Sequence, residues 1–216
     1  MLKYPAIILA GGRATRMNGR DKCLLHLHGK PILAHIRDSL KPQTTQIALN
    51  TNSPPSKFSA FGLPVIPDAI PGFLGPLAGL LTGMLWAQKH HASATHMLSV
   101  AGDTPFLPPD LTARLSESLT GHNADIAIAR DSTGDHPVLG LWPTALASQL
   151  KHDLLEAGPR SIRRWLSGFH VAYATFPGST IPNINTQNDL RHLSDQAETR
   201  STTVLGDDAR PRSYYR

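Results

Sequence analysis

An apolar run that stops abruptly at two glycines constrains the fold more than any other stretch of the chain. Residues 7–10 read Ile-Ile-Leu-Ala, Gly11 and Gly12 follow, and four basic side chains lie between residues 13 and 22. Glycine lets the backbone approach a ligand closely and adopts the positive φ that tight turns need. Consecutive backbone N–H groups in such a turn form a concave anion site. The stretch therefore predicts a buried strand that runs into a phosphate-binding loop, to which Arg16 and Lys22 add positive charge.

This loop differs from the common phosphate-binding motifs. Gly29-Lys30 has no glycine five residues before it and is followed by Pro31, so the Walker pattern is absent. The adjacent glycines of the opening loop also exclude the dinucleotide pattern G-x-G-x-x-G. A basic surface loop with a Gly-Gly turn is the alternative, although such a loop needs no apolar strand leading into it.

Strands and helices alternate through the first 120 residues, which predicts an α/β fold. Apolar runs indicate strands, and longer amphipathic or apolar stretches that begin near a proline indicate helices. The pattern predicts strands at 5–10, 46–50, 64–66 and 95–100, and helices at 31–40, 76–90 and 108–119. Such alternation is typical of a parallel sheet with helices on its faces.

The second half of the chain has a different pattern. Strands at 124–129 and 136–141 flank a turn-rich segment, which predicts a hairpin with a connection of five or six residues. The remaining elements that we predict are helices from 143 and at 161–166, a strand at 169–176, and a terminal helix at 187–194. The sequence is polar and mixed in charge from Asp195 onward, so residues 195–216 are predicted to be a disordered tail after one domain at 1–194.

The net charge of +5 fits anionic substrates. The basic residues gather in the opening loop and at Arg160, Arg163 and Arg164, without the interleaved aromatic residues of a nucleic-acid surface, so we expect no nucleic-acid partner.

Cys23 is the single cysteine, which excludes an intrachain disulfide and fits a reducing cytoplasm. It is followed by Leu24-Leu25 and is interpreted as a packed residue, against the alternative of a basic-loop thiol with a lowered pKa. We expect neither a signal peptide nor a membrane span.

Polar or glycine-rich residues follow four of the predicted strands. They are Gly11-Gly12, Asn50, Asp68 and Gly102-Asp103. Ligands bind at the carboxyl ends of parallel strands, so this pattern predicts a binding site at one sheet edge. Lone Asn and Asp residues also form turns, which is the alternative for each of them taken singly. Asp103 is the candidate metal ligand, because Mg²⁺ takes few protein carboxylates and completes its shell with waters and phosphates. The histidines show no zinc-binding spacing.

The sequence resembles a known family in several motifs that occur in the family's order. Residues 9–22, with the pattern Leu-Ala-Gly-Gly-x-x-x-Arg-Met-x-Gly-x-Asp-Lys, and Gly29-Lys30-Pro31 resemble the signature of nucleotidyltransferases that activate sugars, alcohols and cofactors. Together with 75–79, 102–106 and 183–186, they resemble molybdenum cofactor guanylyltransferases over residues 5–193. Asn18 stands where a glycine is usual in this family, and asparagine tolerates left-handed backbone.

This resemblance implies a fold and a reaction. The fold is a Rossmann-like three-layer nucleotide-diphospho-sugar transferase fold, with a mainly parallel central sheet and helices on both faces. The reaction joins GMP from GTP to the molybdopterin phosphate with Mg²⁺ and releases pyrophosphate. Residues 1–120 would form the GTP-binding half, and residues 121–194 the acceptor-binding half. The implied protein partners are molybdenum-insertion proteins and chaperones of apo-molybdoenzymes, with no membrane partner.

The resemblance also implies roles for individual residues. Arg16, Lys22 and Gly12 would serve turnover, and Asp103 would hold the metal. Gly75, Asn183 and Asn185 would bind the acceptor. The implied GTP-binding residues are Leu9, Ala10, Gly11, Lys22, Asn50, Asp68 and Asp103.

Three other functions remain open at this level. The chain could be a molybdopterin cytidylyltransferase, a sugar-phosphate nucleotidyltransferase, or a non-catalytic molybdopterin carrier. The Gly11-Gly12 pair favours guanine by family analogy alone. His136-Pro137 and the Arg160, Arg163 and Arg164 group fit a strand start and a solvated helix face. The alternative is that one of these arginines contacts the pterin phosphate or a partner protein.

Overall fold

The computed structural model describes residues 2–11, 21–72, 75–156, 161–178 and 180–204, with side chains up to residue 195. Gly12 and Arg16 of the predicted site, and Arg160 of the basic group, lie outside the described residues. None of the helices in these ranges is both long enough and apolar enough to span a membrane.

A central seven-stranded sheet organises the chain, with strand order β5-β4-β1-β6-β8-β7-β9. The neighbours from β5 through β4 and β1 to β6 are parallel, and so are β7 and β9, whereas β8 is antiparallel to both of its neighbours. The predicted mainly parallel sheet is therefore confirmed. The strands are β1 Tyr4–Leu9, β4 Thr44–Asn50, β5 Val65–Ile66, β6 His96–Ala101, β7 Ile126–Asp131, β8 Gly134–Pro143 and β9 Val171–Thr175.

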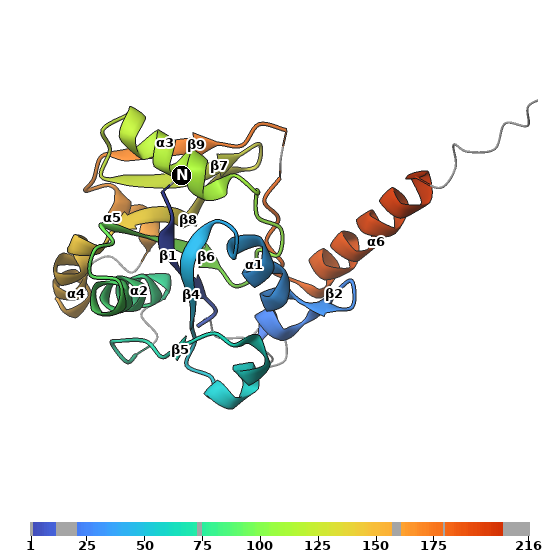
Figure 1. Ribbon diagram of the computed structural model, residues 1–216, viewed down its shortest axis with the longest axis horizontal. Helices are drawn as coiled ribbons and strands as arrows, with labels where there is room; N and C mark the ends of the chain where they lie inside the picture. Colours follow the sequence, from blue (N-terminus) through green and yellow to red (C-terminus); the bar gives the residue numbers. More distant parts are fainter. Residues whose placement is uncertain (1, 12–20, 73–74, 157–160, 179, 205–216) are drawn as a thin grey trace, which may run out of the picture.

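Helices cover both faces of this sheet and make it the middle of three layers. Alternate residues of a strand point to opposite faces, and in β1 the buried Ile8 packs in one apolar cluster and the buried Ile7 in the other. Helices α1 (Ile32–Leu40) and α3 (Leu111–Gly121) contribute to the cluster around Ile8. Figure 1 shows α2 and α4 on one side of the strands and α1 on the other. The Ile7 cluster takes α2 Pro76–His90, α4 Ala147–Leu155 and α5 Ile162–Leu166.

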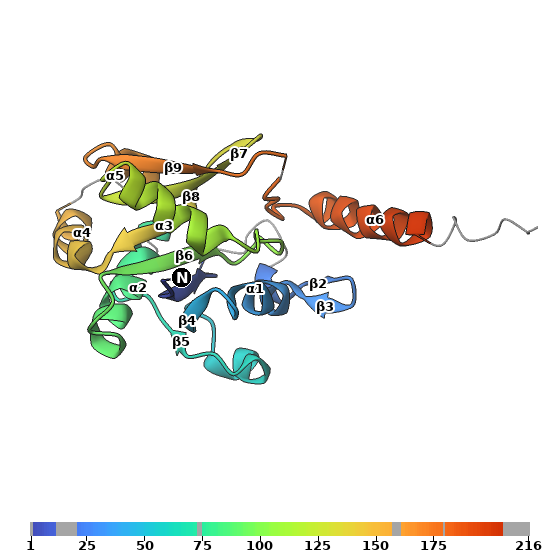
Figure 2. The same cartoon turned by 45° about the horizontal axis from the view of Figure 1, so that its top comes forward.

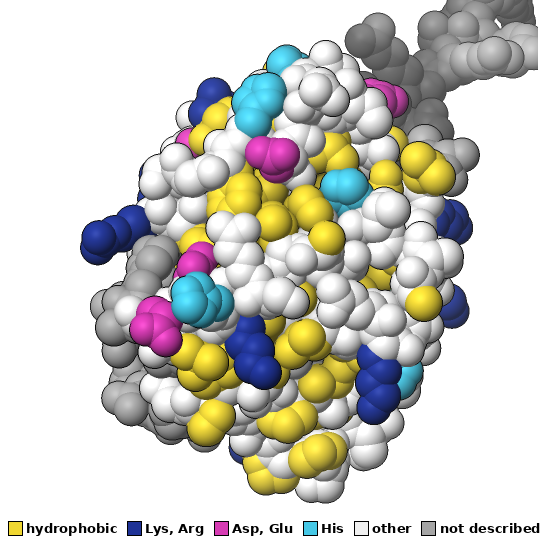
Figure 3. Space-filling model, turned by 90° about the vertical axis from the view of Figure 1, so that its left-hand side faces the viewer, with side chains coloured by type: hydrophobic (Ala, Val, Ile, Leu, Met, Phe, Trp, Pro, Cys, Tyr) yellow, Lys and Arg dark blue, Asp and Glu magenta, His cyan; other side chains and the backbone are white. Residues whose placement is uncertain are grey.

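The face that carries α2 and α4 has a mixed surface. In Figure 3 its lysine and arginine side chains stand apart from one another, between apolar and uncharged atoms. This arrangement differs from a continuous basic stripe, which would provide a single-sign field for a polyanion.

The terminal helix α6 is longer than the sequence predicts. It spans Gln187–Val204, so residues 195–204, predicted as the first part of a disordered tail, are helical, and residues 205–216 lie outside the described ranges. A capping box starts the helix, because Asp189 N–H donates to Thr186 Oγ1 over 3.1 Å and Thr186 N–H donates to Asp189 Oδ2 over 2.8 Å. Once a helix is nucleated, each added residue gains one hydrogen bond, so polar residues without a core can continue it. Figure 2 shows α6 projecting away from the rest of the molecule.

The predicted hairpin is present as β7 and β8, but its connection is shorter than expected. Only residues 132–133 separate the two strands. Asp131 makes this possible, because its Oδ1 accepts hydrogen bonds from the N–H and the hydroxyl of Thr133 over 2.7 and 2.6 Å. Gly134 follows with a φ of 130°, a value that side chains rarely allow.

Several short elements were not predicted, because they are too short for a hydrophobic period to reveal. They are the antiparallel pair β2 His26–Leu27 and β3 Lys30–Pro31, and the 3₁₀ helices η2 Lys22–Leu24, η3 Pro55–Phe61 and η4 Thr144–Leu146.

Candidate functional site

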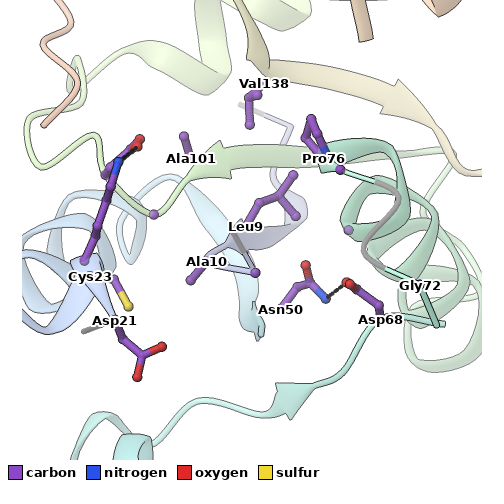
Figure 4. Close-up of a pocket in the computed structure, with 16 residues that line it drawn as sticks. Leu9, Ala10, Asp21, Cys23, Asn50, Asp68, Gly72, Pro76, Ala101 and Val138 are labelled. Carbon is purple, nitrogen blue, oxygen red and sulfur yellow. Dashed lines mark hydrogen bonds and ion pairs between the residues drawn. The ribbon is translucent and has the colours of Figure 1, made fainter. Parts of the chain in front are cut away.

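A cavity of about 570 Å³ opens at the carboxyl ends of β1, β4, β5 and β6 (Figure 4). We call it the nucleotide cavity, after the ligand that the sequence resemblance implies. Its volume is within the range of about 300–1,000 Å³ that is usual for small-molecule sites. Its lining includes eight residues that the sequence assigns to function: Leu9, Ala10, Gly11, Lys22, Asn50, Asp68, Gly75 and Asp103.

The register of the parallel strands brings these residues together. Leu9 at the end of β1 is paired with Asn50 of β4 on one side and with Ala101 of β6 on the other. Two further backbone bonds tie the following loops at the same level, from Ala10 N–H to the Asn50 carbonyl and from Gly102 N–H to the Leu9 carbonyl, both 2.9 Å. The segments that follow β1, β4 and β6 therefore leave the sheet side by side, as expected for a ligand site in an open α/β sheet.

Glycines allow the walls of this cavity to approach one another. A Cβ on Gly79 of α2 would lie 2.5 Å from Asn50 Oδ1, and a Cβ on Gly102 would lie 3.0 Å from the Leu9 carbonyl oxygen. Gly75 precedes α2 with a φ of 75°, which side chains rarely adopt. Gly102 belongs to the strand-end pattern that predicted this site, whereas Gly79 was not singled out, although it occurs in the motif at 75–79.

Asn50 and Asp68 form a polar wall at one end of the cavity. Asn50 is buried and its Nδ2 donates to Asp68 Oδ1 over 2.9 Å, a contact that Figure 4 shows as a dashed line. Asn52, which the sequence did not single out, donates from Nδ2 to the other carboxylate oxygen of Asp68 over 2.8 Å. Asp68 N–H donates in return to Asn52 Oδ1 over 2.9 Å. The carboxylate is thereby held in one orientation, where it can accept hydrogen bonds from hydroxyl or N–H groups of a ligand.

Lys22 and Asp103 form the charged end of the cavity. Lys22 Nζ lies 3.7 Å from Asp103 Oδ2, and each side chain is 25% exposed. Burial raises the pKa of Asp103 above its ordinary value, and the nearby Lys22 ammonium opposes that rise. Lys22 Nζ also donates to Asn185 Oδ1 over 3.4 Å, so a residue from near the C-terminus reaches this end of the cavity.

The chemistry of this end suits a hard divalent cation that shares its shell with a ligand. Within the described ranges, no three His, Cys, Asp or Glu side chains come together as a metal cage. A single carboxylate beside open volume matches Mg²⁺, which usually takes one or two protein carboxylates together with waters and phosphates. A bound cation would offset the cost of burying the negative charge of Asp103.

The predicted acceptor residues separate into two places. Gly75 lines the nucleotide cavity, whereas Asn183 and Asn185 line another cavity, of about 420 Å³, which we call the asparagine cavity. Its lining residues are Thr133, His136, Thr180, Ile181, Pro182, Asn183, Asn185, Asp189, His192 and Leu193. Two bonds attach its wall to the loop of Asp103: Thr104 Oγ1 donates to Asn183 Oδ1 over 2.6 Å, and Ile184 N–H donates to the Asp103 carbonyl over 2.8 Å.

Cys23 and Asp21 also line the nucleotide cavity, and their contacts within the protein indicate structural roles. Cys23 is 2% exposed, and burial together with the negative charges of Asp21 and Asp103 raises the pKa of its thiol to about 12. The interpretation as a packed residue is therefore favoured over a reactive thiol. Asp21 accepts from Ser53 Oγ over 2.6 Å and from Lys57 Nζ over 2.9 Å.

Comparisons with known proteins agree with this arrangement. Residues 6–171 match the family model described as the MobA-like NTP transferase domain. The molybdenum cofactor guanylyltransferase of Bradyrhizobium sp. (strain ORS 278) is 43% identical over 191 residues, which cover 86% of this chain and 89% of the relative.

Two solved structures share the fold at lower identity. The molybdopterin-guanine dinucleotide biosynthesis protein A of Archaeoglobus fulgidus has a TM-score of 0.67 and 21% identity, covering 90% of this chain and 99% of its own. A Mycobacterium tuberculosis H37Rv protein solved in complex with manganese has a TM-score of 0.67 and 20% identity, again covering 90% and 99%. The family model and the close relative cover most of the sequence, so the chain belongs to the MobA-like NTP transferase family and, within it, to the molybdenum cofactor guanylyltransferases.

Proposed function

We propose that the protein transfers GMP from GTP to the phosphate of Mo-molybdopterin, releasing pyrophosphate and forming the guanine dinucleotide form of the cofactor. The observation that carries this proposal is the convergence of Leu9, Asn50, Asp68, Lys22 and Asp103 on one cavity. Membership of the molybdenum cofactor guanylyltransferases supports the identity of GTP as the nucleotide and of molybdopterin as the acceptor.

In this proposal GTP lies along the nucleotide cavity. The backbone of Leu9, Ala10 and Gly11 and the ammonium of Lys22 hold the triphosphate, since N–H groups and positive charge bind anions. Asn50 and Asp68 hold the nucleoside end, where the oriented carboxylate accepts hydrogen bonds. Residues 1–120 would thus form the GTP-binding half and residues 121–194 the acceptor-binding half.

Asp103 is proposed to hold Mg²⁺, which would supply charge stabilisation at the phosphates when bound. Lys22 lies beside Asp103 and would neutralise negative charge on the departing pyrophosphate. Arg16 and Gly12 are assigned to the same step from the sequence alone.

The transfer needs no protein nucleophile. An acceptor phosphate oxygen attacks the α-phosphorus of GTP in line, forming a new P–O–P link as the bond to the β-phosphate oxygen breaks. The protein's contribution is then positioning and electrostatic stabilisation. Asn185 is uncharged, but its side chain accepts a hydrogen bond from Lys22, so in this proposal it lies where the acceptor meets the nucleotide.

The remaining parts of the proposal concern the surroundings. Molybdenum-insertion proteins and chaperones of apo-molybdoenzymes would supply the acceptor and receive the product. A cytoplasmic location fits a sequence with the single cysteine Cys23.

One assay tests the proposal against its rivals. The protein is incubated with Mg²⁺, molybdopterin and each of the four nucleoside triphosphates in turn, and pyrophosphate release is followed. Release with GTP alone supports the proposal, whereas release with CTP alone would identify a cytidylyltransferase. Release only when a sugar phosphate replaces molybdopterin would identify a sugar-phosphate enzyme, and molybdopterin binding without any release would identify a carrier.

A further inference from the structure

Strand β8 separates from both of its neighbours beside the nucleotide cavity. Strand β6 runs to Ala101, but its pairing with β8 stops at Ser99 opposite Gly140. On the other side, the consecutive β7 residues Ile128 and Ala129 lie opposite Gly140 and His136. Residues 137–139 therefore form a bulge, to which Pro137 contributes because it has no N–H for a ladder bond.

The bulge is held by specific contacts. Ser99, which is fully buried, donates its hydroxyl hydrogen to the Val138 carbonyl and accepts from Trp142 Nε1 over 2.7 Å. The result is that neighbouring residues of one strand face different cavities. Val138 lines the nucleotide cavity, and His136 lines the asparagine cavity. Bulges commonly redirect side chains next to active sites.

A buried carboxylate stands behind His136. The Asp131 side chain is 0% exposed, and its Oδ2 lies 3.0 Å from His136 Nε2. The same oxygen accepts from Ile181 N–H over 2.6 Å, and Oδ1 accepts from both groups of Thr133. Burial by itself raises the pKa of Asp131, but these hydrogen bonds outweigh it and hold the pKa well below the ordinary value. Asp131 is thus a fixed anion that joins the hairpin turn, β8 and the segment leading to Asn183.

His136 is available for a ligand. Its side chain is 13% exposed, and its buried Nε2 lies 3.0 Å from Asp131 Oδ2. With Nε2 beside the carboxylate, Nδ1 is the ring nitrogen left to donate to or accept from a ligand. Asp189, another carboxylate of this cavity, already accepts from the N–H groups of Asn185 and Thr186, both over 2.8 Å.

We propose that His136, positioned by Asp131, binds the acceptor substrate in the asparagine cavity beside Asn183 and Asn185. This inference rests on the proposed function and adds a binding residue and a positioning residue to it. The acceptor is an anionic phosphate monoester attached to a polar heterocycle, and an imidazole supported by a carboxylate offers such a molecule a donor or a positive charge. His136 lines no part of the nucleotide cavity, so its effect should be confined to the acceptor.

The test compares His136→Ala with the wild type in steady-state GMP transfer, varying GTP and molybdopterin separately. We expect the KM for molybdopterin to rise by about tenfold to a hundredfold, the usual worth of a hydrogen bond to a charged group, with the KM for GTP unchanged. His122→Ala is the matched control, because His122 is exposed at the end of α3 and lines neither cavity. His136→Gln, which retains a donor, should recover part of the loss.

Asp131 is tested as a positioning residue by Asp131→Asn and by the double variant with His136→Ala. If Asp131 acts through His136, the double variant should bind molybdopterin no more weakly than His136→Ala alone. Where Asp131→Asn does not fold, Asp131→Glu, which keeps the carboxylate, takes its place in the same comparison, and direct titration of His136→Ala with molybdopterin in the absence of GTP tests binding by His136. Fully additive losses, or equal losses for GTP and molybdopterin, would contradict the assignment.

The failure of this inference is distinct from failure of the proposed function. If the wild type transfers GMP and folded His136→Ala keeps the wild-type KM for molybdopterin, the inference is wrong and the proposed function stands. If the wild type releases no pyrophosphate from GTP with molybdopterin, the proposed function is wrong, and the binding titration still tests His136.

Discussion

The ammonium of Lys22 lies 3.7 Å from the carboxylate of Asp103 and 3.4 Å from the side-chain oxygen of Asn185. Three loops that are far apart in the sequence thus meet at one cation. In the proposed function a triphosphate and a metal ion would share this place, with the Lys22 ammonium beside both.

Replacing Lys22 should therefore affect the chemical step. We expect Lys22→Ala to lower kcat by about 10²–10³, the usual loss of one charge-stabilising donor. The pKa of Asp103 should rise further, because Lys22 opposes the effect of burial. Pyrophosphate release measures the first effect, with Lys41→Ala as control, since Lys41 is exposed at the end of α1 and lines neither cavity. Equal kcat in both variants would remove Lys22 from the transfer step.

Arg16→Ala should lower kcat by a similar factor, on the order of 10²–10³. This prediction comes from the sequence motif, in which Arg16 stands between the glycines and Lys22. The measurement is steady-state transfer at saturating GTP and molybdopterin. An unchanged kcat with a raised KM would make Arg16 a ground-state binding residue instead.

Asp103→Asn should lower affinity for Mg²⁺, because an amide oxygen replaces an anionic ligand. Titration of transfer activity with Mg²⁺ checks this, and wild-type activity at limiting Mg²⁺ would exclude Asp103 from the metal site.

The raised pKa of Asp103 also predicts how stability changes with pH. In the metal-free protein the folded state holds the Asp103 proton more tightly than the unfolded chain does. Asp103 therefore lowers the stability of the fold as the pH rises from the ordinary pKa of an aspartate through the raised pKa of the folded state. Mg²⁺ should restore that loss, as an increase in Tm that grows with pH over this window.

Gly79→Ala should weaken GTP binding. The new Cβ would lie 2.5 Å from Asn50 Oδ1, so Asn50 or helix α2 must shift, which strains the 2.9 Å hydrogen bond from Asn50 Nδ2 to Asp68. We expect the KM for GTP to rise by about tenfold, the equivalent of one hydrogen bond. Gly121→Ala is the matched control, because no atom lies within 4 Å of its added Cβ. Equal KM values for GTP in the two variants would contradict a role for the Asn50–Asp68 contact.

Cys23 should be inert in the folded protein. Its thiol is buried and its pKa is raised to about 12, so almost no thiolate is present near pH ~8, where an ordinary cysteine with a pKa of about 8.5 reacts. Iodoacetamide labelling followed by mass spectrometry should show modification only after denaturation. Rapid labelling of the native protein would show that the thiol is accessible.

The local pattern was sufficient for most of the parallel half of the fold. A strand that ends in glycines, followed by alternating helices and strands, predicts both the sheet and the edge at which Leu9, Asn50 and Asp103 meet. The reason is that parallel strands with short crossovers place their carboxyl ends together whatever the side chains are. The positions of Asn50 and Asp68 in one cavity follow from this topology and were predicted as such.

The antiparallel half was predicted less completely. The hairpin turn is shortened by a local contact between Asp131 and Thr133, whereas the β8 bulge is held by Ser99, which donates to the Val138 carbonyl from another strand, a contact that no local pattern contains. The start of α6 at Gln187 was predicted, whereas its continuation to Val204 was not, because the polar sequence after Asp195 has no apolar period that would indicate a helix.

The sequence by itself therefore determined the nucleotide-binding edge, since its residues follow strands whose order the alternation dictates. Only the tertiary structure decided that Asn183 and Asn185 line a cavity of their own, with His136 and Asp131 as neighbours. The physical reason is separation along the chain. Lys22 and Asn185 are 163 residues apart in the sequence, and they meet where the last loop returns to the Asp103 turn through the bond from Ile184 N–H to the Asp103 carbonyl.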